Sequence, residues 1–494
     1  MLGALLLFSL LLPLLFIFFK SKSKSDAKSA PKSYPIIGTY LSVYANRHRL
    51  NEWTSDAVHN SPTLTFLVRR PFGQTRVITG NPSVVQHILK TNFSTYGKGM
   101  FRSTLLDLLG DGIFNVDGDE WKFQRQLSSH EFNTKSLRHF VEHVVDSELN
   151  ERLIPILTTA AANDTVLDLQ DILQRFAFDN ICKIAFGHDP AYLTPSLPQA
   201  KFAVAFDDAV RISSERFRVS TPLLWKIKRF LNMGSEKRLK EAVSEVREFA
   251  KKILDEKKQE LSDKSSIQSV DLLSRFISSG HSDDNFVTDI VISFILAGRD
   301  TTSAALTWFF WLLYKNPAVE SEIVKEINGK SDSAVYDDVK EMVYTHASLC
   351  ESMRFYPPIP VDTKTAVADD ILPEGTVVKK GMVVTYHPYA MGRSEKLWGG
   401  DWMEFRPERW FEKEEGTDDV RFKARDPYTY PVFQAGPRIC LGKDMAFLQM
   451  KRVVAGVLRQ FKVVPVDDGR EPVFVAALTS KMIGGFPVKI KERK

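Results

Sequence analysis

The sequence predicts one mainly helical domain with small β-sheets, placed behind an N-terminal transmembrane helix. Hydrophobic residues make up 44% and charged residues 26% of the 494-residue chain, as in globular proteins. Helical periodicity dominates after residue 81, and two short β-rich runs precede it. The N-terminus begins with one long apolar run. By length alone the chain could also hold up to about three ordinary domains.

Charge and cysteine content exclude two classes of protein. The net charge of +5 is small for this length and gives no reason to expect a nucleic-acid partner. Three cysteines cannot make a disulfide framework, and an odd number leaves at least one thiol free. We therefore expect no nucleic acid as a partner and a reducing compartment.

The apolar run extends from Leu2 to Phe19 and would form a helix about 27 Å long, close to the thickness of a bilayer core. Four lysines follow it directly: Lys20, Lys22, Lys24 and Lys28. A cleaved signal peptide is the alternative. However, no charge precedes the run, the run is longer than a usual signal core, and no A-x-A-like site follows it.

We therefore expect three parts. Residues 1–19 are a transmembrane signal-anchor, 20–38 a basic, proline-containing linker, and 39–494 one large domain. The lysines predict that the N-terminus faces the lumen and the domain faces the cytosol.

Local signals place the elements of the domain in order. Strands are predicted at Thr63–Val68 and Thr75–Thr79. Asn81 is a good N-cap, and Pro82 in the first helical position opens a helix to Lys90. Further helices are predicted at Leu169–Phe186, Ser235–Ser262 and Leu441–Phe461, and a weakly structured linker at Glu412–Pro427.

Two segments have uncertain surroundings. Pro222–Met233 mixes apolar and basic residues, which suits either contact with a membrane surface or an ordinary packed connection. Val287–Tyr314 is hydrophobic enough to suggest a second membrane span, but it contains Asp289, Arg299 and Asp300. Each charge at a bilayer centre costs about 2.5–3.5 kcal/mol. We therefore expect this second segment to be a long helix buried inside the domain.

The middle of this helix is polar, because the stretch 297–302 reads Ala-Gly-Arg-Asp-Thr-Thr. Buried polar groups cost free energy unless they are paired, so such an interruption is typical of a functional site. The alternative is a threonine hydroxyl that bonds back to its own helix. The sequence alone leaves both open.

Cys440 lies in the stretch 433–442, Phe-Gln-Ala-Gly-Pro-Arg-Ile-Cys-Leu-Gly, immediately before a predicted helix. A helix N-terminus stabilises a thiolate there. Gly436 and Gly442 allow unusual backbone angles and the close approach of a flat ligand, and Arg438 supplies a nearby cation. The usual fate of a lone cysteine is a buried inert thiol, which we expect for Cys182 and Cys350.

The pattern F-x-x-G-x-R-x-C-x-G, here from Phe433 to Gly442, occurs by chance in about 10⁻⁴ of sequences this long. It is the motif of haem-thiolate proteins, and the sequence resembles the cytochrome P450 superfamily over essentially its whole length. The resemblance implies the P450 fold with haem b as cofactor. It makes 39–494 a haem-thiolate catalytic domain with Cys440 as axial ligand of the iron.

Three further patterns appear in the order that the superfamily predicts. Glu351 and Arg354 resemble the E-x-x-R element, and their i, i+3 spacing lets them pair on one helix face. Arg409 lies in a P-E-R element, and the resemblance implies a structural network of these three residues behind the haem. Trp121 and Arg125 resemble the W-x-x-x-R element. By resemblance they bind a haem propionate, with Arg438 as a second partner.

The resemblance also assigns the polar helix. Asp300 and Thr301 resemble the acid–alcohol pair that delivers protons during dioxygen cleavage. Gly298 would leave room for oxygen and substrate. Members that use no dioxygen lack this pair, so a monooxygenase is favoured over a haem-binding sensor without turnover. The chain shows no G-x-G-x-x-G and has no length for a flavin domain. By resemblance, electrons come from NADPH through the NADPH-cytochrome P450 reductase of the endoplasmic reticulum membrane, in which this chain would be a single-pass protein.

Four stretches resemble the plant fatty-acid omega-hydroxylases, and within them the long-chain subfamily: 112–146, 169–187, 295–313 and 430–456. The resemblance implies hydroxylation of the terminal carbon of medium- to long-chain fatty acids. A sibling subfamily hydroxylates jasmonoyl-isoleucine, and that substrate, or another plant lipid carboxylate, remains the alternative.

By resemblance, five segments line the substrate pocket: Gly99–Val116, Phe202–Phe217, Ser293–Thr301, Ile359–Lys364 and Ala476–Met482. A cation at the pocket mouth should hold the substrate carboxylate. The candidates are Arg102, Arg211 and Arg216, and an exposed surface arginine is the alternative for each.

Overall fold

The computed structural model describes residues 31–34, 37–71, 74–197, 200–218, 222–263, 271–280, 283–330, 335–413, 420–467, 469 and 471–493. The predicted anchor at 1–19 and most of the linker at 20–38 lie outside these residues. Among the residues that the structure describes, no helix has both the length and the apolar character needed to cross a bilayer.

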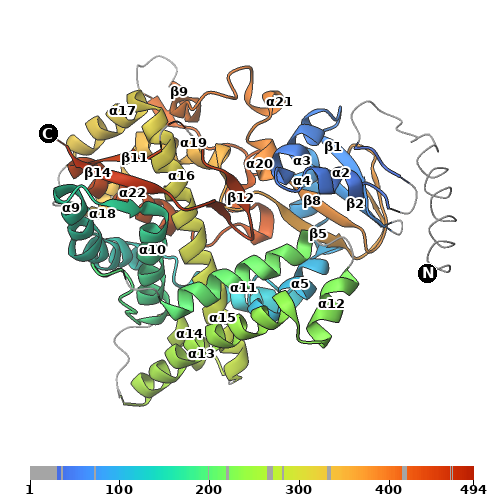
Figure 1. Cartoon of the computed structure of the whole chain (residues 1–494), viewed down its shortest axis with the longest axis horizontal. Coiled ribbons are helices and arrows are strands. Elements are labelled where there is room, and N and C mark those ends of the chain that lie inside the picture. The colour runs from blue at the N-terminus through green and yellow to red at the C-terminus, as the bar shows by residue number, and fades with distance from the viewer. Residues whose placement is uncertain are drawn as a thin grey trace, which may run out of the picture.

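The chain is mainly helical, as predicted, and its small sheets lie toward one side and across the top of the molecule (Figure 1). The α-helices are α2 (Tyr40–Ala45), α3 (Leu50–His59), α4 (Pro82–Gln86), α5 (Met100–Leu109), α6 (Gly118–Ser129), α7 (Thr134–His139), α8 (Asp146–Glu148), α9 (Ile154–Ala162), α10 (Leu169–Phe186), α11 (Lys201–Arg218), α12 (Pro222–Phe230), α13 (Gly234–Asp263), α14 (Leu272–Ser278), α15 (Asp284–Ile295), α16 (Thr301–Lys315), α17 (Pro317–Asn328), α18 (Val335–Lys340), α19 (Val343–Phe355), α20 (Pro388–Met391), α21 (Glu395–Trp398) and α22 (Lys443–Gln460).

The largest sheet has five strands in the order β1-β2-β8-β5-β3. The strands of the molecule are β1 (Thr65–Arg69), β2 (Thr75–Thr79), β3 (Tyr96–Gly97), β4 (Val166–Asp168), β5 (Asp362–Ala366), β6 (Asp370–Ile371), β7 (Val377–Val378), β8 (Val383–Tyr386), β9 (Phe411–Lys413), β10 (Val420–Phe422), β11 (Phe461–Pro465), β12 (Phe474–Ala476), β13 (Ser480–Met482) and β14 (Pro487–Glu492). Strand β2 pairs in parallel with β8, which lies about 300 residues later in the chain. The first and last thirds of the chain therefore share one sheet.

Two predicted helices match the structure closely. Helix α10 has the predicted bounds because Asp168 caps its first turn and Gly187, at φ +64°, ends it in the left-handed conformation. At the predicted helix 81–90, the side chain of Asn81 accepts a hydrogen bond from the Ser83 amide, and the last turn widens into a π-turn at His87–Thr91. The caps decide where both helices begin.

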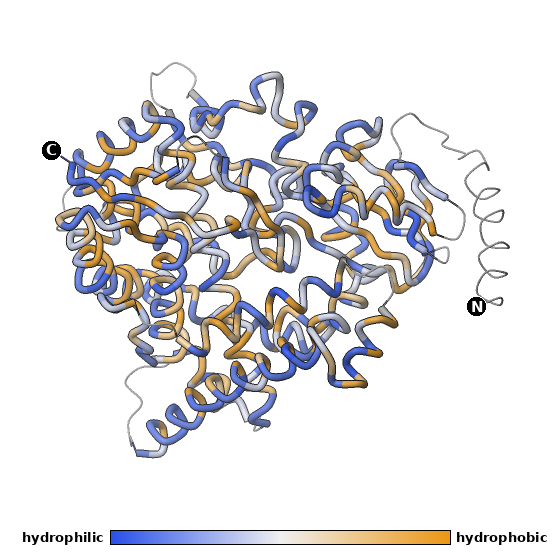
Figure 2. Tube along the Cα trace, viewed as in Figure 1, coloured by the Kyte–Doolittle hydropathy of each residue, from blue (hydrophilic) through white to orange (hydrophobic). Residues whose placement is uncertain are grey.

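The hydrophobic segment at 287–314 is a buried helix, as its charges predicted. It runs through α15, a π-turn η6 (Leu296–Asp300) and α16 as one continuous column. Residues 302–313 of α16 are all buried, and the tube coloured by hydropathy is largely orange along this column (Figure 2). A helix that is apolar on all sides needs neighbours on all sides, and α10, α19 and α22 supply them.

One prediction was wrong. The segment Glu412–Pro427, predicted as a weakly structured linker, contains an antiparallel strand pair. β9 and β10 pair with Lys413 opposite Val420, on either side of the residues outside the description. Charged residues around Glu412 made this segment look like a linker in the sequence. In the structure, Arg421 and Lys423 form ion pairs with the Glu412 carboxylate across the strand pair.

Candidate haem-thiolate active site

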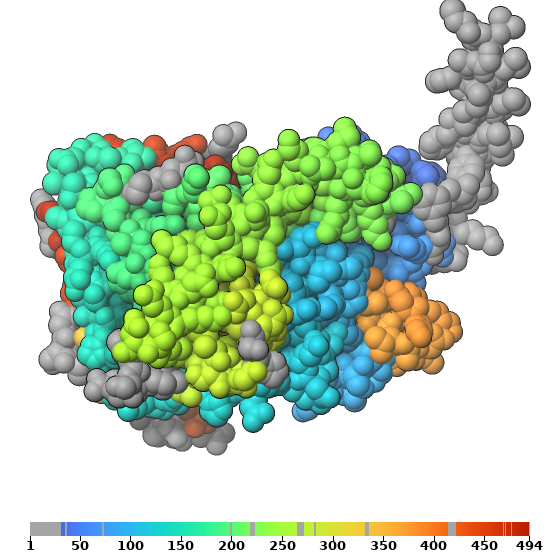
Figure 3. All heavy atoms as spheres, turned by 90° about the horizontal axis from the view of Figure 1, so that it is seen from below, coloured from blue at the N-terminus to red at the C-terminus, as the bar shows by residue number. Residues whose placement is uncertain are grey.

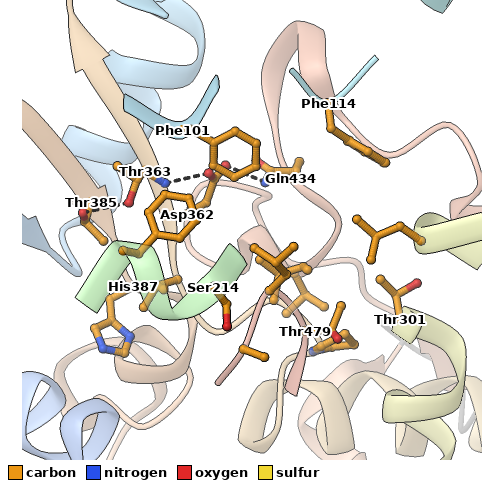
Figure 4. Close-up of a pocket in the computed structure, with 18 of the residues that line it drawn as sticks. Phe101, Phe114, Ser214, Thr301, Asp362, Thr363, Thr385, His387, Gln434 and Thr479 are labelled. Atoms are coloured by element: carbon orange, nitrogen blue, oxygen red, sulfur yellow. Dashed lines mark hydrogen bonds between the residues drawn. The ribbon is translucent and has the colours of Figure 1, made fainter. Parts of the chain in front are cut away.

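A cavity of about 710 Å³ lies between α16 and the loop before α22. Cys440 lies on one wall, and Thr301 of the central helix is also part of the lining. From there the cavity extends across the face of the five-stranded sheet. Figure 4 shows Thr301 at one side of this space and Thr363, Thr385 and His387 at the other, with Phe101 and Thr479 between them.

The loop that carries Cys440 has a closely determined backbone. The Cys440 amide donates a hydrogen bond to the carbonyl of Phe433 at 2.8 Å, which closes the loop. Gly436 has φ +64°, and a Cβ there would lie 2.1 Å from the Leu89 carbonyl oxygen, so no other residue fits. Gly442 is the N-cap of α22. The loop therefore ends at a helix N-terminus and presents the sulfur to the cavity.

The three cysteines differ in surroundings as the sequence predicted. Cys182 and Cys350 are buried, whereas Cys440 is accessible. Its accessible surface lies inside the molecule, because the side chain lines the cavity and is otherwise surrounded by protein. Burial raises the pKa of the Cys440 thiol, and the Gly442 amide together with Arg125 and Lys443 opposes this rise. A metal ion that binds the sulfur would lower the pKa of the thiol and so favour the thiolate.

Cations gather beside Cys440. Trp121, Arg125 and Arg438 all line the cavity, and the guanidinium carbon of Arg438 lies 4.5 Å from the centre of the Trp121 ring. Arg438 pairs with Asp117 at 2.6 Å. Arg125 makes no ion pair with any residue that the structure describes. The structure thus brings together the three residues assigned to propionate binding.

Sequence reasoning missed one more cation at this edge, Lys98. Its ammonium lies 4.6 Å above the Phe101 ring and makes no ion pair within the described part of the chain. Burial and the neighbouring Lys364 lower the pKa of Lys98 well below its ordinary value. An anion beside it would reverse this shift. The lone lysine between Gly97 and Gly99 carries no signal in the sequence, because only the fold brings it to the cavity.

These residues fit haem. The thiol of Cys440 on the cavity wall would bind the haem iron. Arg125, Arg438 and Lys98 form a cationic edge with only Asp117 as a paired carboxylate, which suits a ligand with two carboxylates of its own. When bound, the haem iron would supply the binding and reductive cleavage of dioxygen.

Across the cavity, Thr301 and Gly298 lie where the helix column widens. The Thr301 hydroxyl donates to the Ala297 carbonyl at 2.6 Å, so it bonds back to its own helix and also faces the cavity. Gly298 lines the cavity through its backbone, but a Cβ there would lie 2.5 Å from Ile181 of α10. The structure therefore explains Gly298 by the close approach of two helices, whereas the sequence suggested space for oxygen.

Asp300 is not part of the cavity lining. It is 1% exposed, and one of its oxygens accepts a bond from Arg299 at 2.9 Å. Arg299 also donates to Asp207, which in turn accepts a bond from Lys481 at 3.0 Å. The Asp207 side chain is 41% exposed. Burial raises the pKa of Asp300, while Arg299 and Lys481 oppose that rise. The carboxyl group is thus connected to the surface through charged side chains.

Behind the Cys440 loop, the structure brings Glu351, Arg354 and Arg409 together. Glu351 accepts from Arg354 at 2.8 and 2.9 Å and from Arg409 at 2.7 Å. The indole of Trp410 donates to the same carboxylate at 3.0 Å. Glu351 and Arg354 are fully buried. The network ties α19 to the segment before β9.

Replacing Glu351 with glutamine is expected to lower the free energy of unfolding by about 3–5 kcal/mol, because two buried guanidinium groups lose their carboxylate. The matched control is Glu322→Gln, which breaks an exposed pair with Lys325 and should cost at most about 1 kcal/mol. Urea unfolding of the haem-loaded protein measures both. Equal losses in the two variants would show that the network contributes no stability.

Each of the five predicted wall segments contributes to the cavity lining, although Phe202–Phe217 does so only near its end. Phe202 itself packs on Phe249 and Phe178 in the core. The predicted carboxylate anchors are not part of the lining. Each is paired with a carboxylate elsewhere: Arg102 with Asp111, Arg211 with Asp208 and Glu215, and Arg216 with Asp107 and Glu236. That expectation was wrong, since sequence cannot show which arginines are neutralised by their neighbours.

A loop-held cysteine on the cavity wall, across from a polar kink in a central helix and with arginines at the edge between them, is the arrangement expected of a haem-thiolate monooxygenase. The sequence model of the family described as Cytochrome P450 matches residues 29–482. The chain therefore belongs to the cytochrome P450 family, as its motifs predicted.

Similar relatives place the chain within that family. Cytochrome P450 94A1 of Vicia sativa is 64% identical over 465 residues, which cover 94% of this chain and 90% of the relative. Cytochrome P450 94A2 of Vicia sativa is 62% identical over 97% of this chain and 96% of the relative. Cytochrome P450 94B1 of Arabidopsis thaliana is 50% identical over 96% and 93%. The protein is a P450 monooxygenase of the 94 family.

Proposed function

We propose that this monooxygenase hydroxylates the terminal carbon of medium- to long-chain fatty acids, with electrons from NADPH delivered by the NADPH-cytochrome P450 reductase. The observation that carries the proposal is the shape and lining of the cavity. Apolar side chains make up much of its lining, and its arginines outside the haem edge all come from residues 47–76, on and before strands β1 and β2. The apolar lining includes Leu105, Leu109, Ile113, Phe114, Phe217, Phe294, Leu296, Val361 and Leu478. An alkyl carboxylate has the same distribution of apolar and charged groups.

Attack at the terminal carbon demands positioning. A primary C–H bond is stronger than its internal neighbours, so the methyl group must be held at the reacting position while the next carbon is kept away. Phe114 and Thr301 lie on the same side of the cavity in Figure 4. Ile181 and Ala305 belong to the same lining.

The test is turnover of two substrates by the full chain, co-expressed with the reductase in microsomes. Dodecanoic acid with NADPH is expected to give the ω-alcohol, identified by gas chromatography and mass spectrometry. Turnover of jasmonoyl-isoleucine without turnover of fatty acids would replace this proposal by its alternative. Mainly ω-1 products would contradict terminal selectivity.

We also propose that the protein is held at the endoplasmic reticulum membrane with its catalytic domain in the cytosol. Support comes from α12, whose outer face carries large exposed apolar residues next to Lys226 and Lys228. These apolar residues and their neighbours after the helix are Leu223, Leu224, Ile227, Phe230, Leu231 and Met233. In Figure 3, the light-green segment that contains α12 lies on the surface beside the blue N-terminal part of the chain. A patch that combines apolar and basic residues suits an anionic lipid surface.

Phe230, at 88% exposure, is expected to insert into lipid. A Phe230→Cys variant of the full chain, labelled with a fluorophore in nanodiscs, should be quenched by brominated lipids. The matched control is Met403→Cys, 70% exposed and far from α12 in sequence, which should not be quenched. Labelling is done on the haem-loaded protein, in which Cys440 would be covered by the haem, and Cys182 and Cys350 are buried. Equal quenching at both positions would refute contact through α12.

A further inference from the structure

Arg76 of β2 is a cation of the cavity that no part of the site described above uses. Its strand neighbours define the face on which it lies. Arg76 is opposite Val68 of β1 and Val383 of β8, and two residues further on Ile78 is opposite Thr385. Because side chains two apart in a strand share a face, Arg76 shares the face of Ile78 and Thr385. All three line the cavity.

No carboxylate balances the charge of Arg76 within the described part of the chain. There its Nη2 donates to the thioether sulfur of Met100 at 3.9 Å, and its buried Nε finds no hydrogen-bond partner. Burial and the adjacent charge of Arg70 lower the pKa of Arg76 to about 9, so it remains a cation at neutral pH.

An unpaired guanidinium inside a protein is costly, because desolvation of a charge is repaid only by a close opposite charge or by full hydrogen bonding. Arg76 is half-buried, with its Nε fully covered, whereas the fully buried arginines of the described residues show the usual solution. Arg216 has Glu236 and Asp107, and Arg354 has Glu351. Arg76 departs from this rule at a position where the cavity would bring a ligand to it. That combination points to an anionic group on the ligand.

The position of Arg76 separates it from the haem edge. Strand β5 lies next to the Cys440 loop, since Gln434 of that loop bonds to Asp362 at 2.9 Å. From β5 the sheet continues to β8 and then to β2. Each step is about 4.8 Å, so Arg76 lies about two strand spacings, roughly 10 Å, beyond β5 along the cavity. A group bound there stands well away from Cys440 and Thr301.

The surroundings of Arg76 strengthen its positive field. The same end of the cavity is lined by Arg47, Arg69 and Arg70, with Glu52 as the acidic residue there. A cavity mouth lined by positive charges attracts negatively charged ligands and raises their association rate. Lys364 of β5 also lines the cavity, but it is already neutralised by Asp362 at 2.8 Å and so offers no free charge.

We propose that Arg76 is a specificity-determining residue that binds the carboxylate of the substrate. It would fix the distance between that carboxylate and the reacting end, so that the terminal carbon reaches Thr301. This inference rests on the proposed function in its choice of an amphiphilic carboxylate with an apolar tail. It assigns the anchor that the sequence had placed at Arg102, Arg211 or Arg216.

The experiment compares an acid with its neutral ester in haem-loaded full-length protein. Dissociation constants for dodecanoic acid and methyl dodecanoate are measured from the substrate-induced change in the haem absorption spectrum. The variants are Arg76→Met, Arg76→Lys and the control Arg211→Met, an exposed arginine outside the cavity. Haem content and the reduced carbon monoxide spectrum confirm that each variant folds.

Arg76→Met is expected to weaken binding of the acid by about 10- to 100-fold and to leave the ester unchanged, since a charged hydrogen-bonded pair is lost only with the acid. Arg76→Lys should recover part of this loss. The fraction of ω product should fall in Arg76→Met, while Arg211→Met behaves as the wild type. Equal losses for acid and ester, or no loss for the acid, would overturn the assignment.

A wrong substrate class and a wrong anchor residue give different results in this experiment. If the wild type binds no fatty acid, the proposed substrate is wrong, and the same comparison is made with jasmonoyl-isoleucine and its methyl ester. A selective loss with that acid in Arg76→Met would retain the anchor. Absence of any preference of the wild type for acid over ester in both pairs would overturn it.

Discussion

Replacing Cys440 with serine is expected to abolish hydroxylation and to remove the thiolate-type Soret band of the reduced carbon monoxide complex. The sulfur is the only cysteine thiol among the described residues that faces the cavity. A serine hydroxyl does not ionise near neutral pH and donates far less electron density to iron than a thiolate does, so dioxygen cleavage loses its driving group. We expect the variant still to bind haem, because the cations at the haem edge are unchanged.

The absorption spectrum of the reduced complex and the turnover of dodecanoic acid measure this prediction. The matched control is Cys350→Ala, which removes a buried thiol that does not line the cavity and should leave spectrum and turnover intact. A thiolate-type band that persists in Cys440→Ser would contradict the ligand assignment. Loss of the band in Cys350→Ala as well would attribute the effect to misfolding.

The sequence predicted those features whose cause is local. The bounds of α10 follow from a cap at Asp168 and a left-handed glycine at Gly187, both of which can be read from the residues themselves. Gly436 was predicted to adopt an unusual backbone angle, and it has φ +64°. The pairing of Glu351 with Arg354 follows from helical spacing. Such features depend on neighbours within about one turn.

Features that depend on distant neighbours could not be predicted. Arg76 lies in the short strand Thr75–Thr79, and nothing in that stretch distinguishes a cation at a cavity from one at the surface. Arg102 was equally possible as an anchor from the sequence, but Asp111, nine residues later, neutralises it. Gly298 shows the same limit, because its close neighbour Ile181 lies 117 residues earlier in the chain. Only the assembled fold shows which residues are partners.

Asp300 and Thr301 are adjacent in sequence but face different sides of the helix, since successive residues are about 100° apart. The hydroxyl of Thr301 faces the cavity, whereas the carboxyl of Asp300 faces Arg299, with Asp207 and Lys481 beyond it. One side chain of the pair therefore faces the cavity, and the other faces the charged side chains that lead to the surface. Asp300, whose pKa is raised by burial, can carry a proton inward from the surface, and Thr301 can hold a water or proton acceptor at the cavity.

Replacing Asp300 with asparagine is accordingly expected to slow product formation by about 10²–10⁴-fold, because the isosteric amide cannot exchange the proton that the relay requires. Thr301→Val should instead lower the amount of product per NADPH consumed, since dioxygen reduction continues without controlled proton supply. Both are measured as ω-alcohol formed and NADPH oxidised by the reconstituted full chain with its reductase.

Asp289→Asn is the matched control, because Asp289 is also a buried carboxylate of the same helix column. It accepts from Arg247 at 2.7 Å and from the Asp111 amide at 2.8 Å, and it does not line the cavity. Its replacement should lower stability but leave the ratio of product to NADPH unchanged. If Asp289→Asn slows product formation as much as Asp300→Asn does, the effect arises from lost packing and not from proton delivery. Comparing Asp300→Asn with Asp289→Asn thus shows whether the carboxylate of Asp300 is needed for proton delivery or only for stability.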